Sequence, residues 1–146
     1  MKSNKGFTLV ELLAVIVILA IIALIATPII LGVIDTARRG SAEASALAYV
    51  KAVEDQIVIS QVTTDETDDI ELPTTGNKSY ATSELTGVKV KGAKPSAETG
   101  TVVISSTGEV QSGTCLVVTM NGMTYNVAYN GSTASVQDTA CTNPTT

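Results

Sequence analysis

Glu11 is the one charged residue in an apolar run over residues 7–34. An ionised carboxylate is costly to place in hydrocarbon, so a chain that keeps one there needs a cation to pair with it. Two other outcomes stay open: Glu11 can bond within its own chain, or its side chain can reach the headgroups at the membrane edge. This carboxylate is therefore the first candidate for a functional residue.

The rest of the chain offers little for catalysis. It has no His, which excludes a His base or a His metal ligand. We find no nucleophile–base–acid set, phosphate loop or cofactor fingerprint. One acidic cluster could hold Ca²⁺ through oxygen ligands, but it lacks the glycine and terminal glutamate placement of an EF-hand loop. It comprises Asp65, Glu66, Asp68, Asp69 and Glu71. We expect a solvated loop there, no metal, no cofactor and no enzymatic activity.

The charge balance points away from nucleic acid. Nine cations and fourteen acids give a formal net charge of −5. Without Lys2 and Lys5, seven cations would face fourteen acids, which gives −7. Such an acidic body repels a phosphate backbone, so we expect no nucleic-acid partner.

The apolar run is long enough to cross a bilayer, which takes about 20 apolar residues. It is too long for the apolar part of a secretory signal peptide, which has roughly 7–15 residues. Lys2 and Lys5 precede the run and should stay on the cytoplasmic side, with the remainder of the chain outside. We therefore expect a single-pass precursor in the cytoplasmic (inner) membrane.

Residues 5–12 read KGFTLVEL. With the short basic leader and the apolar tail, they resemble the processing motif (class III leader) of type IV prepilins, Gram-positive ones included, and of related pseudopilins. The resemblance runs from Lys5 to about Tyr49, and beyond that only the architecture is similar. It implies that a prepilin peptidase cuts between Gly6 and Phe7, removes the leader 1–6 and methylates the new amine of Phe7. It also implies a homopolymeric filament, with a platform protein and an assembly ATPase as partners.

Cleavage would place an ammonium on Phe7, since an α-amino pKa of about 8 keeps that group mostly charged. The ammonium opposes the dipole at a helix N-terminus, whereas a carboxylate in the first turn suits it. If Glu11 of one copy meets the Phe7 amine of the next, both charges are neutralised and the axial register of identical helices is fixed. We therefore predict an assembly role for Glu11.

We predict an α+β fold in which a long helix, over about residues 7–61, packs on a small antiparallel sheet of three to four strands. Its part over 7–34 is apolar on every side and should form the transmembrane or filament-core segment. Pro28 has no N–H to donate and Gly32 follows one turn later, so we expect a kink. By resemblance, the helix can unwind here inside filaments; an ordinary kink of a membrane helix is the alternative.

Residues 35–146 should form a globular head. Its helical part, 35–61, carries an apolar stripe at helical spacing that should pack on the sheet. The stripe consists of Ala46, Val50, Val53 and Ile57. Arg38 and Arg39 follow the apolar run and could touch anionic headgroups, pair with acids of neighbouring copies, or lie in a solvated turn.

Residues 62–100 are polar and poor in pattern, which predicts a loop with one short strand at 88–90. Alternation over 101–137 predicts a β-meander. The Asn121-Gly122 pair is a strong hairpin signal, and Asn130 should likewise form a turn.

Cys115 and Cys141 do not have a zinc or redox spacing. In an exported chain they should form one disulfide that ties the C-terminal tail to a strand, whereas in a reducing compartment they would stay thiols. By resemblance, a disulfide-closed C-terminal segment favours a pilin.

These features together predict the structural subunit of a type IV pilus, an extracellular filament for adhesion, surface motility or related functions. Two alternatives share the same N-terminus. One is a pseudopilin of a type II secretion or competence system, and the other is a minor tip pilin with a ligand-binding head.

Overall fold

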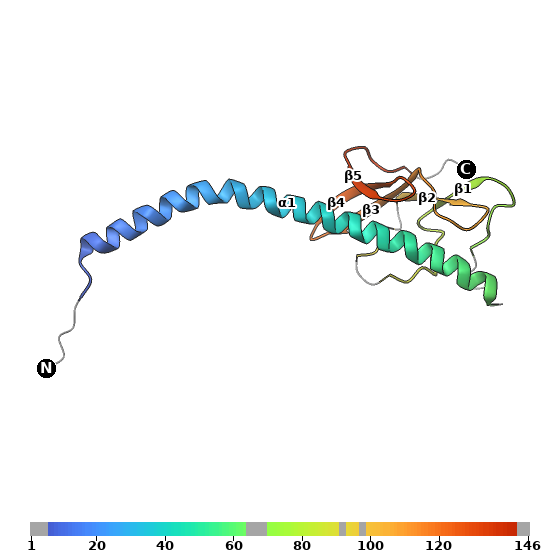
Figure 1. Cartoon of the computed structure of the whole chain (residues 1–146), viewed down its shortest axis with the longest axis horizontal. Coiled ribbons are helices and arrows are strands. Elements are labelled where there is room, and N and C mark those ends of the chain that lie inside the picture. The colour runs from blue at the N-terminus through green and yellow to red at the C-terminus, as the bar shows by residue number, and fades with distance from the viewer. Residues whose placement is uncertain (1–5, 64–69, 91–92, 97–98, 143–146) are drawn as a thin grey trace. The chain divides into compact units, whose positions relative to one another are not determined.

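A computed structural model of the chain describes residues 6–63, 70–90, 93–96 and 99–142. One helix and five strands lie within these residues (Figure 1). They are α1 (Leu9–Val62), β1 (Asn77–Ala81), β2 (Gly100–Ser105), β3 (Thr114–Met120), β4 (Met123–Tyr129) and β5 (Ala134–Gln137). The predicted α+β class is confirmed, with one strand more than expected. The chain divides into two compact units, Met1–Ala37 and Arg38–Thr146.

The described part of the first unit is the apolar portion of α1. Its large side chains are exposed to solvent in the single chain. An 18-residue window of α1 has a mean hydropathy of 3.2, so by length and composition the helix could cross a membrane. The helix is continuous past Pro28 and Gly32. Whether these two residues bend it in use stays a prediction.

The second unit begins with the remaining turns of α1, which bury one face. Every residue of the predicted stripe is buried, and the buried face also includes Ala42 and Tyr49. The burial follows from helical spacing, because residues three and four apart lie on one side of the helix. This face packs with the sheet into one hydrophobic cluster.

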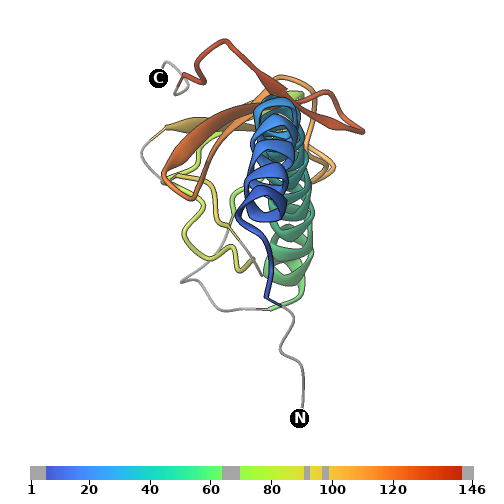
Figure 2. The same ribbon diagram turned by 90° about the vertical axis from the view of Figure 1, so that its left-hand side faces the viewer.

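The five strands form a single antiparallel sheet in the order β1-β2-β3-β4-β5, each strand pairing with its neighbour in sequence. Figures 1 and 2 show the sheet beside the second half of α1. Alternate residues of the strands face the helix, as the period of two requires. The most deeply buried of them are Val102, Ile104, Leu116, Val118 and Val127.

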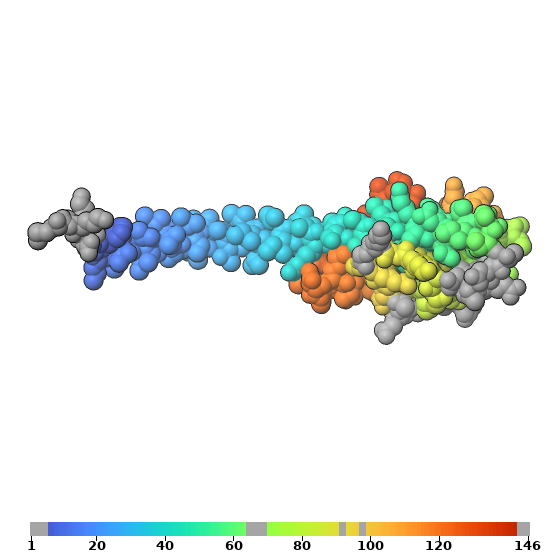
Figure 3. All heavy atoms as spheres, turned by 90° about the horizontal axis from the view of Figure 1, so that it is seen from below, coloured from blue at the N-terminus to red at the C-terminus, as the bar shows by residue number. Residues whose placement is uncertain are grey.

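The predicted strand at residues 88–90 is wrong. Among the described residues that segment pairs with no strand, and the extra strand is β1, which pairs with β2 from Asn77 to Ala81. Val88 is buried and Val90 is partly buried against the core. Their alternation with lysines therefore comes from packing on the core and not from strand pairing. Figure 3 shows this yellow loop against the green part of α1.

The two Asn-Gly turns form as predicted. Met120 pairs with Met123, and the two residues between them both have positive φ, 50° at Asn121 and 78° at Gly122. This conformation matches the twist of the flanking strands and favours Asn followed by Gly. Asn130 uses its Oδ1 atom to accept from the backbone N–H groups of Ser132 and Thr133, at 3.0 and 2.8 Å.

Two glutamates of α1 fasten the helix to the sheet region, a role that the sequence analysis missed. Glu43 accepts from the Val136 N–H at 2.9 Å, and Glu54 accepts from the Val110 N–H at 3.0 Å. A backbone N–H left without an acceptor in such a partly buried place would cost about 1–3 kcal/mol.

Burial and the nearby charge of Glu54 raise the pKa of the Tyr129 hydroxyl.

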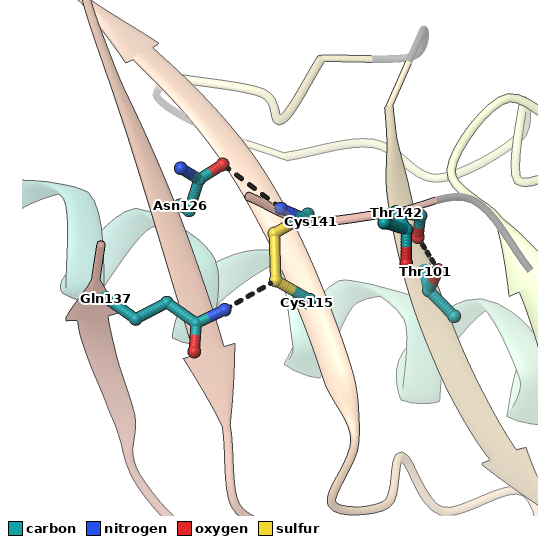
Figure 4. Close-up of a disulfide and its surroundings, with 6 residues drawn as sticks. All are labelled: Thr101, Cys115, Asn126, Gln137, Cys141 and Thr142. Atoms are coloured by element: carbon teal, nitrogen blue, oxygen red, sulfur yellow. Dashed lines mark hydrogen bonds between the residues drawn. A yellow bond between two sulfur atoms is a disulfide. The ribbon is translucent and has the colours of Figure 1, made fainter. Parts of the chain in front are cut away.

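The expected disulfide joins Cys115 and Cys141, whose Cα atoms are 5.5 Å apart (Figure 4). Cys141 also donates its N–H to Asn126 Oδ1 at 3.4 Å, and the Thr101 hydroxyl donates to the Thr142 carbonyl. The tail is thus held against three strands. With a sequence separation of 26 residues, the closed loop should stabilise the fold by about 3–4 kcal/mol in a chain-entropy account.

The burial of Tyr49 predicts a loss of stability in alkali. Only 1% of this residue is exposed, and burial raises the pKa of its hydroxyl to about 12. In the unfolded chain the group ionises near pH 10. Between these values the unfolded state binds fewer protons, so the free energy of unfolding falls as the pH rises from about 10 towards 12.

We expect Tyr49→Phe to lose less stability over this interval than the wild type, measured by guanidinium unfolding of the full chain in detergent. The two proteins should differ little at pH 7, where the hydroxyl is neutral in both states. Parallel losses above pH 10 would contradict the assignment.

Candidate assembly site at the helix start

Thr8 and Glu11 form a reciprocal cap at the start of α1. Glu11 Oε2 accepts from the Thr8 N–H at 2.8 Å and from the Thr8 hydroxyl at 2.7 Å. The Glu11 N–H donates back to Thr8 Oγ1 at 3.3 Å. This is the capping box of a Thr-x-x-Glu sequence, and it satisfies backbone donors that a helix start would otherwise leave unpaired. The local sequence therefore sets where α1 begins.

Thr8 is the residue of this candidate site that the sequence analysis missed. A Thr three residues before an acid, directly ahead of an apolar run, was an available signal. The helix accordingly begins at Leu9, two residues later than predicted. Of the outcomes considered for Glu11, bonding within its own chain is present in this single copy.

The cap leaves the carboxylate able to accept from a further donor. An ionised carboxylate has about four acceptor positions on its two oxygens, and Thr8 engages Oε2. The capping bonds also restrain the Glu11 side chain, so its charge stays at the N-terminal end of the helix. Glu11 can thus combine a local role with a role between copies.

Gly6 and Phe7 lie just before this cap. A Cβ atom built on Gly6 would meet nothing within 4 Å, so the fold itself does not require glycine there. The Phe7 residue is 83% exposed. Neither residue is held by packing, which leaves the bond between them accessible in this chain.

The other predicted positions are distributed elsewhere. Pro28 and Gly32 lie inside α1, and a Cβ atom on Gly32 would also meet open space. Cys115 and Cys141 belong to the second unit. Of the acidic cluster, residues 65–69 lie outside the described residues.

A family model described as the prokaryotic N-terminal methylation motif matches residues 1–27. No curated protein and no solved structure matches the chain significantly. The matched residues contain Gly6, Phe7 and the Thr8–Glu11 cap.

The chain therefore carries the class III signal of type IV pilins, on a helix-and-sheet arrangement like that of type IV pilins. This motif indicates a type IV pilin-like or pseudopilin precursor. The motif implies processing by a prepilin peptidase and assembly into a polymer, and with the apolar helix it suggests a membrane-anchored precursor.

The cap makes a local prediction. Thr8→Val keeps the size of the side chain but removes the hydroxyl that both donates to and accepts from Glu11. Loss of an N-cap hydroxyl costs about 1 kcal/mol. We expect faster amide hydrogen exchange over residues 9–12 of the full chain in detergent micelles, and no change at residues 46–57. Unchanged exchange over the first turn would mean that the cap does not hold the helix start in solution.

Proposed function

We propose that this chain is a pilin, the structural subunit of a type IV pilus. A prepilin peptidase cuts between Gly6 and Phe7 on the cytoplasmic side and methylates the Phe7 amine. A platform protein and an assembly ATPase then lift the mature chain from the membrane into a filament on the cell surface, used for adhesion, motility or related functions. The observation that carries the proposal is the capped carboxylate of Glu11, which lies four residues after the Gly6–Phe7 bond at the start of an exposed apolar helix.

The apolar helix supports polymerisation because its exposed side chains need to be covered from water. The large apolar residues over 7–34 are exposed in the single chain. Lipid covers such a surface before assembly, and the helices of other copies can cover it afterwards. Head-to-tail contacts between copies build a helical polymer when the rotation from one copy to the next does not close into a ring.

The charge pair supplies the register that apolar contacts lack. Apolar contacts between helices are non-directional, so they leave the axial offset weakly defined. Glu11 of one copy and the Phe7 ammonium of the next define one offset. In the pair each charge compensates the other, and their attraction in an apolar environment is stronger than in water.

Gly6 tests the processing step. Because nothing in the fold needs glycine at this position, Gly6→Leu should leave the chain folded and inserted but uncut. Gly32→Ala is the matched control, since it also adds a side chain in open space and should be processed normally. Mass spectrometry of the N-terminus should find a chain that begins at Phe7 with one added methyl in the wild type and the control. A mature N-terminus from Gly6→Leu would refute the processing site.

Two substitutions at Glu11 separate the cap from the charge. Gln can replace Glu in a capping box, so Glu11→Gln keeps the cap and removes the charge, whereas Glu11→Ala removes both. We expect both variants to be cleaved and both to lose most fibres in electron micrographs of cells. Thr8→Val keeps the charge and should keep most fibres.

Fibres from Glu11→Gln equal to wild type in number and length would eliminate the register role and leave the cap as the function of Glu11. The wild-type micrographs also test the main alternative. Long fibres built mainly from this chain indicate a pilin, whereas a pseudopilin of a secretion or competence system would build only short ones.

A further inference from the structure

The tip of the β3–β4 hairpin, residues 120–123, lies against the first turn of the second unit. Arg38 Nη1 donates to the Met123 sulfur at 3.3 Å, and the Tyr125 hydroxyl donates to the same sulfur at 3.5 Å. Figure 3 shows the orange hairpin beside this part of α1. Arg38 follows the last apolar residue, Ile34, by four residues, or about 6 Å of helix. The residue that contacts the hairpin tip is thus joined to the apolar run by only three intervening residues.

The hairpin is uncharged in an otherwise acidic head. Residues 110–137 contain no Asp, Glu, Lys or Arg. The acids that adjoin this stretch in sequence are Glu109 and Asp138. Glu43 and Glu54 of α1 contact the stretch at Val136 and Val110, outside the hairpin tip 120–123. A surface that approaches anionic lipid must avoid carboxylates, and this hairpin does so.

The side chains at the hairpin tip suit the polar boundary of a bilayer. Met123 is 46% exposed, and its neighbours Asn121, Gly122 and Thr124 are exposed as well. Methionine is flexible and apolar, so it can enter the headgroup layer without a fixed shape. Sulfur is only a weak acceptor, so Arg38 can exchange it for a phosphate oxygen, which a guanidinium binds through two parallel hydrogen bonds.

We propose that the hairpin tip and Arg38 form a membrane-docking surface for anionic phospholipid, used while the precursor waits in the membrane. Met123 enters the headgroup layer and Arg38 binds a lipid phosphate. The proposal rests on the membrane-inserted state in the proposed function and adds to it a contact between the head and the lipid surface.

The chain contains no Trp, so a single introduced Trp reports its own position. Met123→Trp in the full chain would be reconstituted into phosphatidylcholine vesicles with and without one-third phosphatidylglycerol, with brominated lipid as the quencher. Ser106→Trp is the matched control, because Ser106 is exposed at the β2–β3 turn. Flotation of the vesicles measures insertion separately.

With phosphatidylglycerol, we expect the indole introduced by Met123→Trp to be quenched and shifted to shorter wavelength, and the one introduced by Ser106→Trp to be neither. The ratio of quenched to unquenched indole measures how much of the chain is docked. Arg38→Gln in the Met123→Trp chain should lower this ratio roughly fivefold, the effect of one basic residue near an anionic surface. Arg38→Lys keeps the charge and should lower the ratio less.

Unquenched fluorescence from Met123→Trp chains that float with the vesicles would overturn the docking proposal and leave the proposed function intact. Equal quenching with and without phosphatidylglycerol would overturn it too, because anionic lipid would then be irrelevant. Failure of the wild-type chain to float would instead contradict the membrane-inserted precursor.

Discussion

The solvation of the N-terminal half of α1 is the constraint on which the rest of this molecule depends. Its large apolar side chains lie exposed in the single chain, and exposing so long an apolar surface to water is unfavourable. Lipid or other copies of the same helix must cover it. Within that surface one carboxylate, Glu11, keeps a charge that the covering environment must also accommodate. In the proposed function, membrane insertion and polymerisation are two ways of covering this surface.

The structure adds a local reason for the position of that carboxylate. Because Thr8 and Glu11 cap the helix together, the charge has a fixed place at the helix end before any partner arrives. A preorganised acceptor loses less conformational freedom on pairing than a mobile side chain does. The cap and the proposed pair with Phe7 are therefore compatible, and the cap would make the pair more specific.

The second unit solves a different problem, which is to build a stable head from little apolar material. Its core combines one helix face with the inner face of a five-stranded meander. Three further devices support that core: the carboxylates of Glu43 and Glu54, which meet backbone N–H groups, and the disulfide to Cys141. Each joins segments distant in sequence, which is how a small core gains cooperativity.

The sequence alone determined the features that depend on local pattern: the apolar helix, its buried stripe from Ala46 to Ile57, and the Asn-Gly turns. Helical periodicity and turn chemistry act over a few residues, so they can be read without a structure. Only the tertiary structure decided that β1 pairs with β2 while Val88 is buried in a loop, that two glutamates fasten the helix, and that Arg38 meets Met123. These choices compare partners up to 93 residues apart, and local pattern holds no information on which distant groups will meet.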